Sequence, residues 1–337
     1  EIMSSDWSSD VCSSDLFNFG SIVLDGTDVA NYNASLASAI DFEANVTATN
    51  ITASTASLSV SDGVTVAVDT FTIGDSDVDP GTVTTMTLGP SAILDVADFL
   101  ISGSFGYYGD LSISVDNLNV DADSVISANS KGYAAAEGPG AGGLDGEWGG
   151  GGGHGGVGAS KNNAAGGVRY GSALQPVTEG SGGNGGGPSY GGAGGGAMHL
   201  VVADTLTLDG TLSANGAGGH SRGSGGAGGS IFVETGTFTG EGAIEAIGGR
   251  GGDNYGIHAG GAGGRIAVYC TTNTYTGTLN VAGGDTGGQA GTAAIFDNSN
   301  PDDMNFEVGH SWNFEPDDGP FEFNTVTLTG TDTATSY

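Results

Sequence analysis

The sequence contains one internal repeat with a nearly fixed period. The motif GGAGG occurs at residues 191–195, 225–229 and 260–264, at intervals of 34 and 35 residues. Each copy precedes an apolar stretch, a Thr-X-Thr stretch, a Gly-containing turn, a third apolar stretch and a Gly-rich loop. One such unit cannot bury its own apolar face, whereas stacked copies can, so the repeat predicts a solenoid.

Alternation of apolar and polar residues predicts that the units are built from strands. Leu111, Ile113 and Val115 alternate with Ser and Asp, and similar runs recur between residues 17 and 129. No window combines a helical stripe with helix caps. About 20 residues of each unit are enough for three short strands, which suits one coil of a parallel β-helix. A β-sandwich is the alternative, but it does not explain recurring strand triplets with one side-chain pattern.

The same alternation identifies the side chains that should point into the solenoid. The expected inward residues are Leu200, Val202, Leu206, Leu208, Ile231, Val233, Phe238, Ile266, Val268, Tyr275 and Leu279.

Composition divides the chain into five parts. They are a non-native start (1–16), β-solenoid coils (17–135), a Gly-rich excursion (136–196), coils with the 34–35-residue repeat (197–297), and a loop with the start of a further coil, truncated (298–337). The Gly-rich stretch 138–196 would be a flexible coil if it were a plain linker. We expect it instead to be partly ordered and packed on the solenoid, because residues without a Cβ can pack backbone to backbone.

The first residues do not fit the rest of the chain. Residues 6–16, DWSSDVCSSDL, are similar to the translation of a sequencing-library adapter, without a mismatch. We therefore expect residues 1–16 not to be native protein, and the chain to be a piece of a longer gene product. Cys12 is then not a native residue. Cys270 is therefore the one native cysteine, and an internal disulfide is excluded. We expect Cys270 to be a small buried or half-buried residue.

Charge limits the partners of the chain. Six Lys and Arg stand against 39 Asp and Glu, for a net charge of −33. Such a chain repels phosphate backbones, which excludes nucleic acid as a partner. No run of 18 apolar residues occurs, so we expect no transmembrane segment in the sequence. The acidic residues are expected to form a solvated surface.

The order of motifs between about residues 111 and 300 resembles a family of proteins. The run GGGHGGVGAS, then YGSALQP, GSGG, and the three GGAGG units resembles a Gly-rich β-helical segment of large secreted or surface proteins of bacteria, often adhesin-like. The resemblance implies a right-handed, pectin-lyase-like parallel β-helix and an extracellular or bacterial cell-surface location. It implies no characterised reaction and carries over no catalytic residue.

One short motif points to an enzyme. Gly153-His154-Gly155 resembles the GHG motif of polygalacturonases, which share the β-helix fold. Those enzymes also need paired Asp residues before the His and a basic clamp after it, and this chain has its Asp pairs later, at 302–303 and 317–318. We therefore interpret His154 as a residue of a poly-Gly run, and a polysaccharide-degrading β-helix enzyme stays an alternative function.

Two acidic stretches are candidate calcium sites. Asp75, Asp77 and Asp79 alternate in DSDVDPG, and Asp253 lies in GGRGGDNY, which fits one copy of a calcium-binding nonapeptide. A nonapeptide site needs tandem turns, and the first stretch lacks the Glu of an EF-hand. No cofactor is therefore expected, with calcium as the one candidate. The histidines at 199, 220, 258 and 310 share no metal-ligand spacing.

Thr-X-Thr recurs in the strand stretches, which predicts Thr rows on one outer face of stacked strands. The rows would contain Thr205, Thr207, Thr237, Thr239, Thr274 and Thr276. Thr is also a good strand former and an ordinary outward residue. An ice-binding solenoid is a second alternative function if the rows are in register on a flat face.

These observations favour a structural or adhesive β-solenoid segment of a secreted or cell-surface protein. It would bind carbohydrate or other surface molecules weakly through an extended face.

Overall fold

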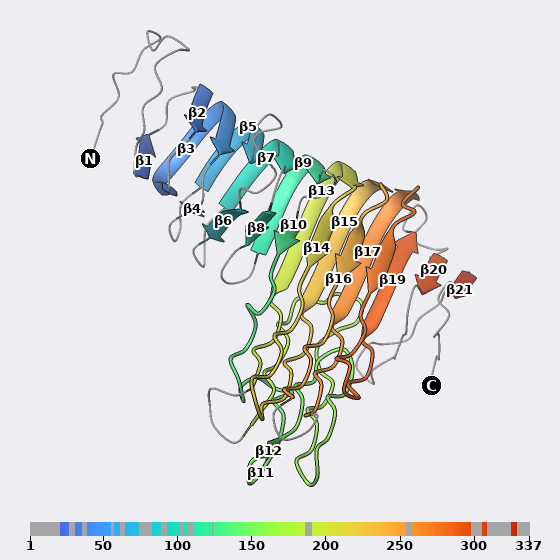
Figure 1. Cartoon of the computed structure of the whole chain (residues 1–337). Coiled ribbons are helices and arrows are strands. Elements are labelled where there is room, and N and C mark those ends of the chain that lie inside the picture. The colour runs from blue at the N-terminus through green and yellow to red at the C-terminus, as the bar shows by residue number, and fades with distance from the viewer. Residues whose placement is uncertain are drawn as a thin grey trace.

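The described part of this chain is all-β and contains no helix. The computed structural model describes residues 117–120, 122, 125–185, 191–253 and 258–297 in full, and elsewhere the backbone of the strands named below. Parallel strands lie side by side in one long twisted row, and a dense region of loops hangs from one side of it (Figure 1). The predicted all-β class and the absence of helix are confirmed for these residues.

Most strands belong to two parallel ladders that alternate along the chain. The long ladder consists of β3 (Ala39–Ser54), β5 (Thr65–Ile73), β7 (Ile93–Ile101), β9 (Leu111–Val120), β13 (Ala197–Leu208), β15 (Ser230–Thr239), β17 (Arg265–Asn273) and β19 (Thr292–Asp297). The short ladder consists of β4 (Ser57–Val60), β6 (Val83–Leu88), β8 (Ser104–Gly106), β10 (Val125–Ser127), β14 (Thr211–Ser213), β16 (Ala243–Glu245) and β18 (Thr278–Asn280).

Two strands start the row and two follow it. β1 (Ser21–Gly26) and β2 (Asn31–Ser35) pair in parallel with β3. At the other end β20 (Asn305–Val308) runs antiparallel to β19, and β21 (Thr325–Leu328) is parallel to β20. The stretch predicted to start a further coil thus joins the sheet through a strand of opposite direction. Residues 1–16, including the adapter-like stretch, lie outside the described residues.

The first two strands predicted for each unit are one continuous strand. The apolar and the Thr-X-Thr stretches of the first GGAGG unit both lie in β13. Between Val202 and Thr205 the register shifts against both neighbouring strands, because two residues of β13 stand opposite one residue of each neighbour, Gly236 of β15 and Asp116 of β9. This bulge lets one strand form two differently directed halves. The sequence pattern predicted the two halves correctly but not their continuity.

The core lies between the inward side chains of the stacked strands. Leu200, Leu206 and Ile231 have no exposed surface, and the alternation of burial along β13 follows the predicted period of two. Burial of each such side chain contributes roughly 1.5–3 kcal/mol. The predicted inward set is buried except for Tyr275 and Leu279, which are half-buried. Cys270 is buried, as expected.

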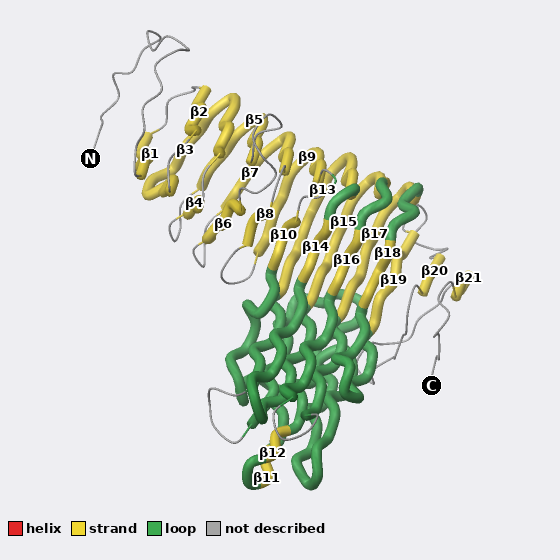
Figure 2. The backbone as a smooth tube through the Cα atoms, in the orientation of Figure 1, coloured by secondary structure: helices red, strands yellow, loops and turns green. Residues whose placement is uncertain are grey.

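A Gly-rich excursion interrupts the repeat between β10 and β13. Its described part covers residues 133–185, after segment 128–132, which follows β10, and before segment 191–196, which leads into β13. Within it β11 (Leu144–Asp145) and β12 (Trp148–Gly149) form a small antiparallel hairpin. The hairpin lies at the far end of the loop region from the ladders (Figure 2).

Candidate functional site

The loop region is a bundle of extended Gly-rich segments. Segments that follow the short strands form an outgoing layer, made of residues 128–132, 214–219, 246–252 and 281–284. Segments that lead back into the long strands form a returning layer, made of residues 191–196, 224–229, 259–264 and 287–291. Each repeat therefore supplies one segment to each layer, below its own strands (Figure 2).

Backbone hydrogen bonds in the returning layer have a period of three residues. In segment 224–229 the N–H groups of Gly225 and Gly228 point to the next returning segment, and those of Gly226 and Gly229 point to the outgoing layer. The N–H groups of Ser224 and Ala227 point to the excursion. The N–H groups of residues 224 to 229, taken in order, donate to the carbonyls of Asn184, Ala259, Ala217, Ser181, Ala262 and Ala214, at 2.7–3.0 Å.

A period of three identifies the conformation of these segments. The polyproline II helix has three residues per turn and no internal hydrogen bonds, so its N–H groups point to three neighbours in turn. Glycine is needed because the neighbouring backbones are close. A Cβ on Gly225 would meet the carbonyl of Gly249, and a Cβ on Gly229 would meet that of Gly196. The backbone of segment 224–229 is thus tightly packed against its neighbours.

The excursion fills the three grooves between the four returning segments. Residues 180–184 lie between the first two segments, residues 150–153 between the next two, and residues 156–159 between the last two. Each inserted segment donates to one neighbour and accepts from the other: Gly152 donates to Gly225 and accepts from Ala262. The excursion is therefore a third layer of the bundle.

His154 anchors this third layer. Its side chain has no exposed surface, and its Nδ1 lies 2.8 Å from the carbonyl oxygen of Gly228. Its Nε2 lies 3.0 Å from Oγ1 of Thr178. Because a carbonyl can only accept, the proton is on Nδ1, and Nε2 accepts from the Thr178 hydroxyl. The ring also packs against Tyr170, with centroids 4.9 Å apart.

Burial keeps this imidazole neutral. Desolvation and the nearby positive charge of Arg265 lower the pKa of His154 to about 3, although carbonyl contacts partly oppose the shift. Both ring nitrogens are engaged and the ring has no contact with solvent. His154 therefore offers no accessible base to a dissolved substrate and acts as a positioning residue.

Arg265 and Ser230 hold a strap, residues 170–178, on the outer side of the long ladder. Arg265 is fully buried, and its Nε donates to the carbonyl of Tyr170 at 3.1 Å. The hydroxyl of Ser230 donates to the carbonyl of Thr178 at 2.6 Å. These two contacts fix both ends of the strap on neighbouring strands. Burial raises the pKa of Tyr170, so its hydroxyl stays protonated and donates to the carbonyl of Glu179.

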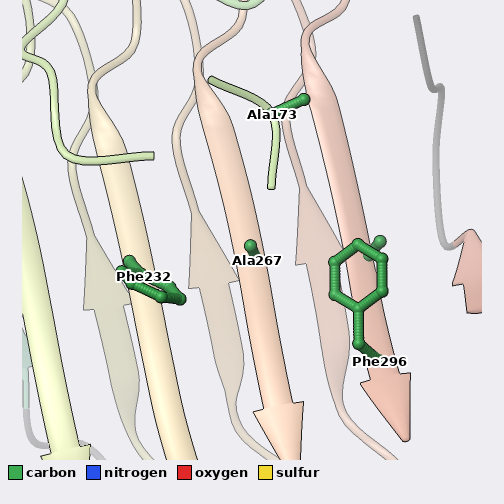
Figure 3. Close-up of a cluster of buried hydrophobic side chains, with 5 residues drawn as sticks. Ala173, Phe232, Ala267 and Phe296 are labelled. Carbon is green, nitrogen blue, oxygen red and sulfur yellow. The ribbon is translucent and has the colours of Figure 1, made fainter. Parts of the chain in front are cut away.

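An apolar cluster lies beneath the strap. Ala173 of the strap packs with Phe232 of β15, Ala267 of β17 and Phe296 of β19 (Figure 3). Phe232 is 6% exposed and Phe296 is fully buried. The outer face of the long ladder is thus covered here by the excursion rather than by solvent.

Aromatic rings continue along this outer face. His199 stacks on Phe232 at 4.6 Å between centroids, and Tyr269 stacks on Phe296 at 4.5 Å. Nε2 of His199 also donates a hydrogen bond to Oε1 of Glu234 at 2.9 Å. Each stack covers one face of each of the two rings.

Comparison of the chain with protein-family models, with curated proteins and with solved structures finds no match.

The predicted Thr rows lie on the C-terminal halves of strands in the long ladder. Thr205 of β13 stands beside Thr237 of β15, and Thr207 stands beside Thr239. Phe238, between the two Thr residues of β15, is buried as expected. Thr-X-Thr stretches on neighbouring strands are thus in register.

The rows change at both sides of this pair of strands. In β17 the residue beside Thr237 is Thr272, and Thr274 and Thr276 follow the end of the strand. In β9 Asn117 and Asn119 stand beside Thr205 and Thr207. The continuous Thr array is therefore short, and ice binding stays a prediction.

Of the four calcium candidates, only Asp253 lies within the described residues. Asp75, Asp77 and Asp79 lie outside the described residues. Asp253 is exposed, and its carboxylate lies 4.0 Å from Nη2 of Arg250. The part of the chain that the structure describes contains no group of three or more His, Cys, Asp or Glu side chains that could hold a metal ion.

Two further features bear on partners. Every Lys and Arg of the chain lies between Lys131 and Arg265, so the positive charges are confined to the bundle and the repeats that carry it. Among the described residues, no helix is long and apolar enough to cross a membrane.

Sequence reasoning missed the two anchors. The sequence predicts His154 as one residue of a poly-Gly run and does not predict the burial of Arg265. A signal was present, because each is a bulky polar residue directly beside glycines that permit close backbone contact.

Proposed function

We propose that this chain is a structural and adhesive segment of a secreted or cell-surface protein. In this proposal the two ladders close into a right-handed parallel β-helix of the pectin-lyase-like type. Support comes from their regular alternation along the chain. Connections between parallel strands of one sheet are right-handed in about 98% of cases.

The observation that carries the proposal is the projecting Gly-rich bundle. It hangs from the side of the ladders (Figure 2) and is held by backbone contacts and buried anchors. The fully buried His154 is engaged at both ring nitrogens, which favours a role in shape rather than in catalysis. A rigid projection of this kind suits contact with other surfaces.

Charge suggests which part makes the contact. The ladder strands before residue 131 carry no Lys or Arg, so they repel anionic surfaces. The bundle holds Lys161, Arg222 and Arg250, with Arg250 60% exposed. We propose that the bundle is the face that binds carbohydrate or other surface molecules. Each contact is weak, and several contacts made at once hold the ligand.

Binding and turnover on the same polysaccharides test this proposal. Residues 17–337 are displayed on beads and incubated with a panel of neutral and acidic polysaccharides, with beads carrying an unrelated acidic protein as control. We expect salt-sensitive retention of at least one polysaccharide and no release of reducing ends. Absence of retention across the panel, or steady release of reducing ends, would overturn the proposal.

A further inference from the structure

The returning layer has two faces that differ in what they bind. One face contacts the outgoing segments of the same repeats, through bonds such as Gly226 to Ala217 and Gly261 to Gly249. The other face contacts the excursion, through bonds such as Ala227 to Ser181 and Ala262 to Gly152. The first set joins residues that are close in sequence, whereas the second joins residues of different units.

The order of the chain separates the two sets in time. The excursion precedes residues 224–264, whose carbonyls and N–H groups form the grooves that it fills. The grooves between the returning segments can therefore form only after the excursion has been synthesised. Local hydrogen bonds within each repeat can form as that repeat is completed.

The fit of groove and segment is specific for glycine. A Cβ on Gly151 would meet the carbonyl of Gly260, and a Cβ on Gly155 would meet that of Gly264. Both clashes are with backbone of the returning layer. A segment that enters these grooves must therefore be rich in glycine and extended at three residues per turn.

We propose that the returning layer is a receptor surface, formed by the repeats alone, for Gly-rich polyproline II segments. Its occupant is the excursion of this chain, residues 150–159 and 180–184, which docks as a separate cooperative unit. His154 and the strap secure the docked unit through Gly228, Ser230 and Arg265. The inference goes beyond the proposed adhesive function and does not depend on it.

Amide hydrogen exchange of the full chain tests the proposal residue by residue. The variant Gly151→Ala places a methyl group against Gly260 and should expel the excursion. We expect exchange at Ala227 and Ala262, which donate to the excursion, to accelerate at least tenfold. Exchange at Gly226 and Gly261, which donate to the outgoing layer, should stay within about twofold of the unchanged chain.

Gly218→Ala is the matched control, because its added Cβ has only one neighbour, the carbonyl oxygen of Arg250 at 3.4 Å. It should leave both sets of amides unchanged. Acceleration of both sets in Gly151→Ala, acceleration of neither, or failure of that variant to fold would overturn the proposal.

The unchanged chain supplies a second, independent measurement. Urea is increased to concentrations below the global transition. The amides of Ala227 and Ala262 should then exchange through a partial unfolding that exposes less surface than the unfolding that frees Gly226 and Gly261. One common opening for all four amides would show that the bundle is a single unit and would contradict the proposal.

Discussion

The Nδ1 atom of His154 lies 2.8 Å from the carbonyl oxygen of Gly228, so a residue of the excursion is joined to a repeat that follows it in the chain. The bond is buried and forms part of the contact between the second and third layers of the bundle. A side-chain anchor is needed there because glycine backbones alone provide no rotamer or shape that fixes their register.

Removal of this anchor should destabilise the bundle. In His154→Ala the carbonyl of Gly228 and the hydroxyl of Thr178 lose their partner, and a cavity remains in a fully buried site. We expect the free energy of unfolding from urea titration to fall by roughly 2–4 kcal/mol. The exposed His220 gives the control, because His220→Ala should change it by less than about 0.5 kcal/mol. Equal effects of the two substitutions would contradict the role of the anchor.

The same residue predicts a pH dependence. The folded state lowers the pKa of His154 from 6.5 to about 3, so between these values the unfolded state binds more protons. The contribution of a neutral His154 is full above pH 6.5 and is lost as the pH falls. Relative to His154→Gln, the unchanged chain should lose about 3 kcal/mol of unfolding free energy between pH 7 and pH 4. A difference that stays constant with pH would be inconsistent with the buried neutral imidazole.

Two Gly→Ala substitutions separate tight from open positions of the bundle. A Cβ on Gly261 would meet the carbonyl of Gly226 and the N–H of Ala227, whereas a Cβ on Gly218 lies in ordinary contact with one carbonyl. Gly261→Ala should lower the free energy of unfolding by at least about 2 kcal/mol, and the melting temperature should fall with it. Gly218→Ala should be neutral or slightly stabilising, because alanine restricts the unfolded chain. Similar melting temperatures for both variants would refute the close packing.

The strap should depend on the apolar cluster beneath it. Phe232→Ala removes a side chain that is 6% exposed and packed with Ala173. We expect a loss of about 3–5 kcal/mol in unfolding free energy, together with faster proteolysis within residues 170–178. Val168→Ala, at a side chain 61% exposed, is the control and should change neither. An unchanged cleavage rate in Phe232→Ala would show that the strap is held without this cluster.

The strands were predictable because their side chains alternate. Leu200 and Val202 could be assigned inward from the period of two, and their burial confirms it. The continuity of β13 could not be predicted, because a bulge at residues 203–204 has no distinct sequence signal. Register to neighbouring strands, such as Thr237 beside Thr272, is set by packing of the whole ladder and departs from simple repeat alignment.

The bundle was less predictable than the strands. Glycine permits both a flexible coil and a packed polyproline II segment, and composition does not separate the two. The deciding information is the alignment of distant segments, such as Gly152 with Gly225, which only the fold supplies. The neighbouring glycines mark His154 and Arg265 as positions of close contact, but the partners of the two side chains follow from that alignment.

In the bundle, glycine-rich segments with three residues per turn pack through backbone hydrogen bonds in three directions. Couplings through hydrogen bonds, measured by NMR on isotope-labelled chain, test it directly. We predict couplings from the nitrogen of Ala227 to the carbonyl carbon of Ser181, from Gly228 to Ala262, and from Gly229 to Ala214. Absence of all three, with random-coil shifts for residues 224–229, would contradict the packed bundle.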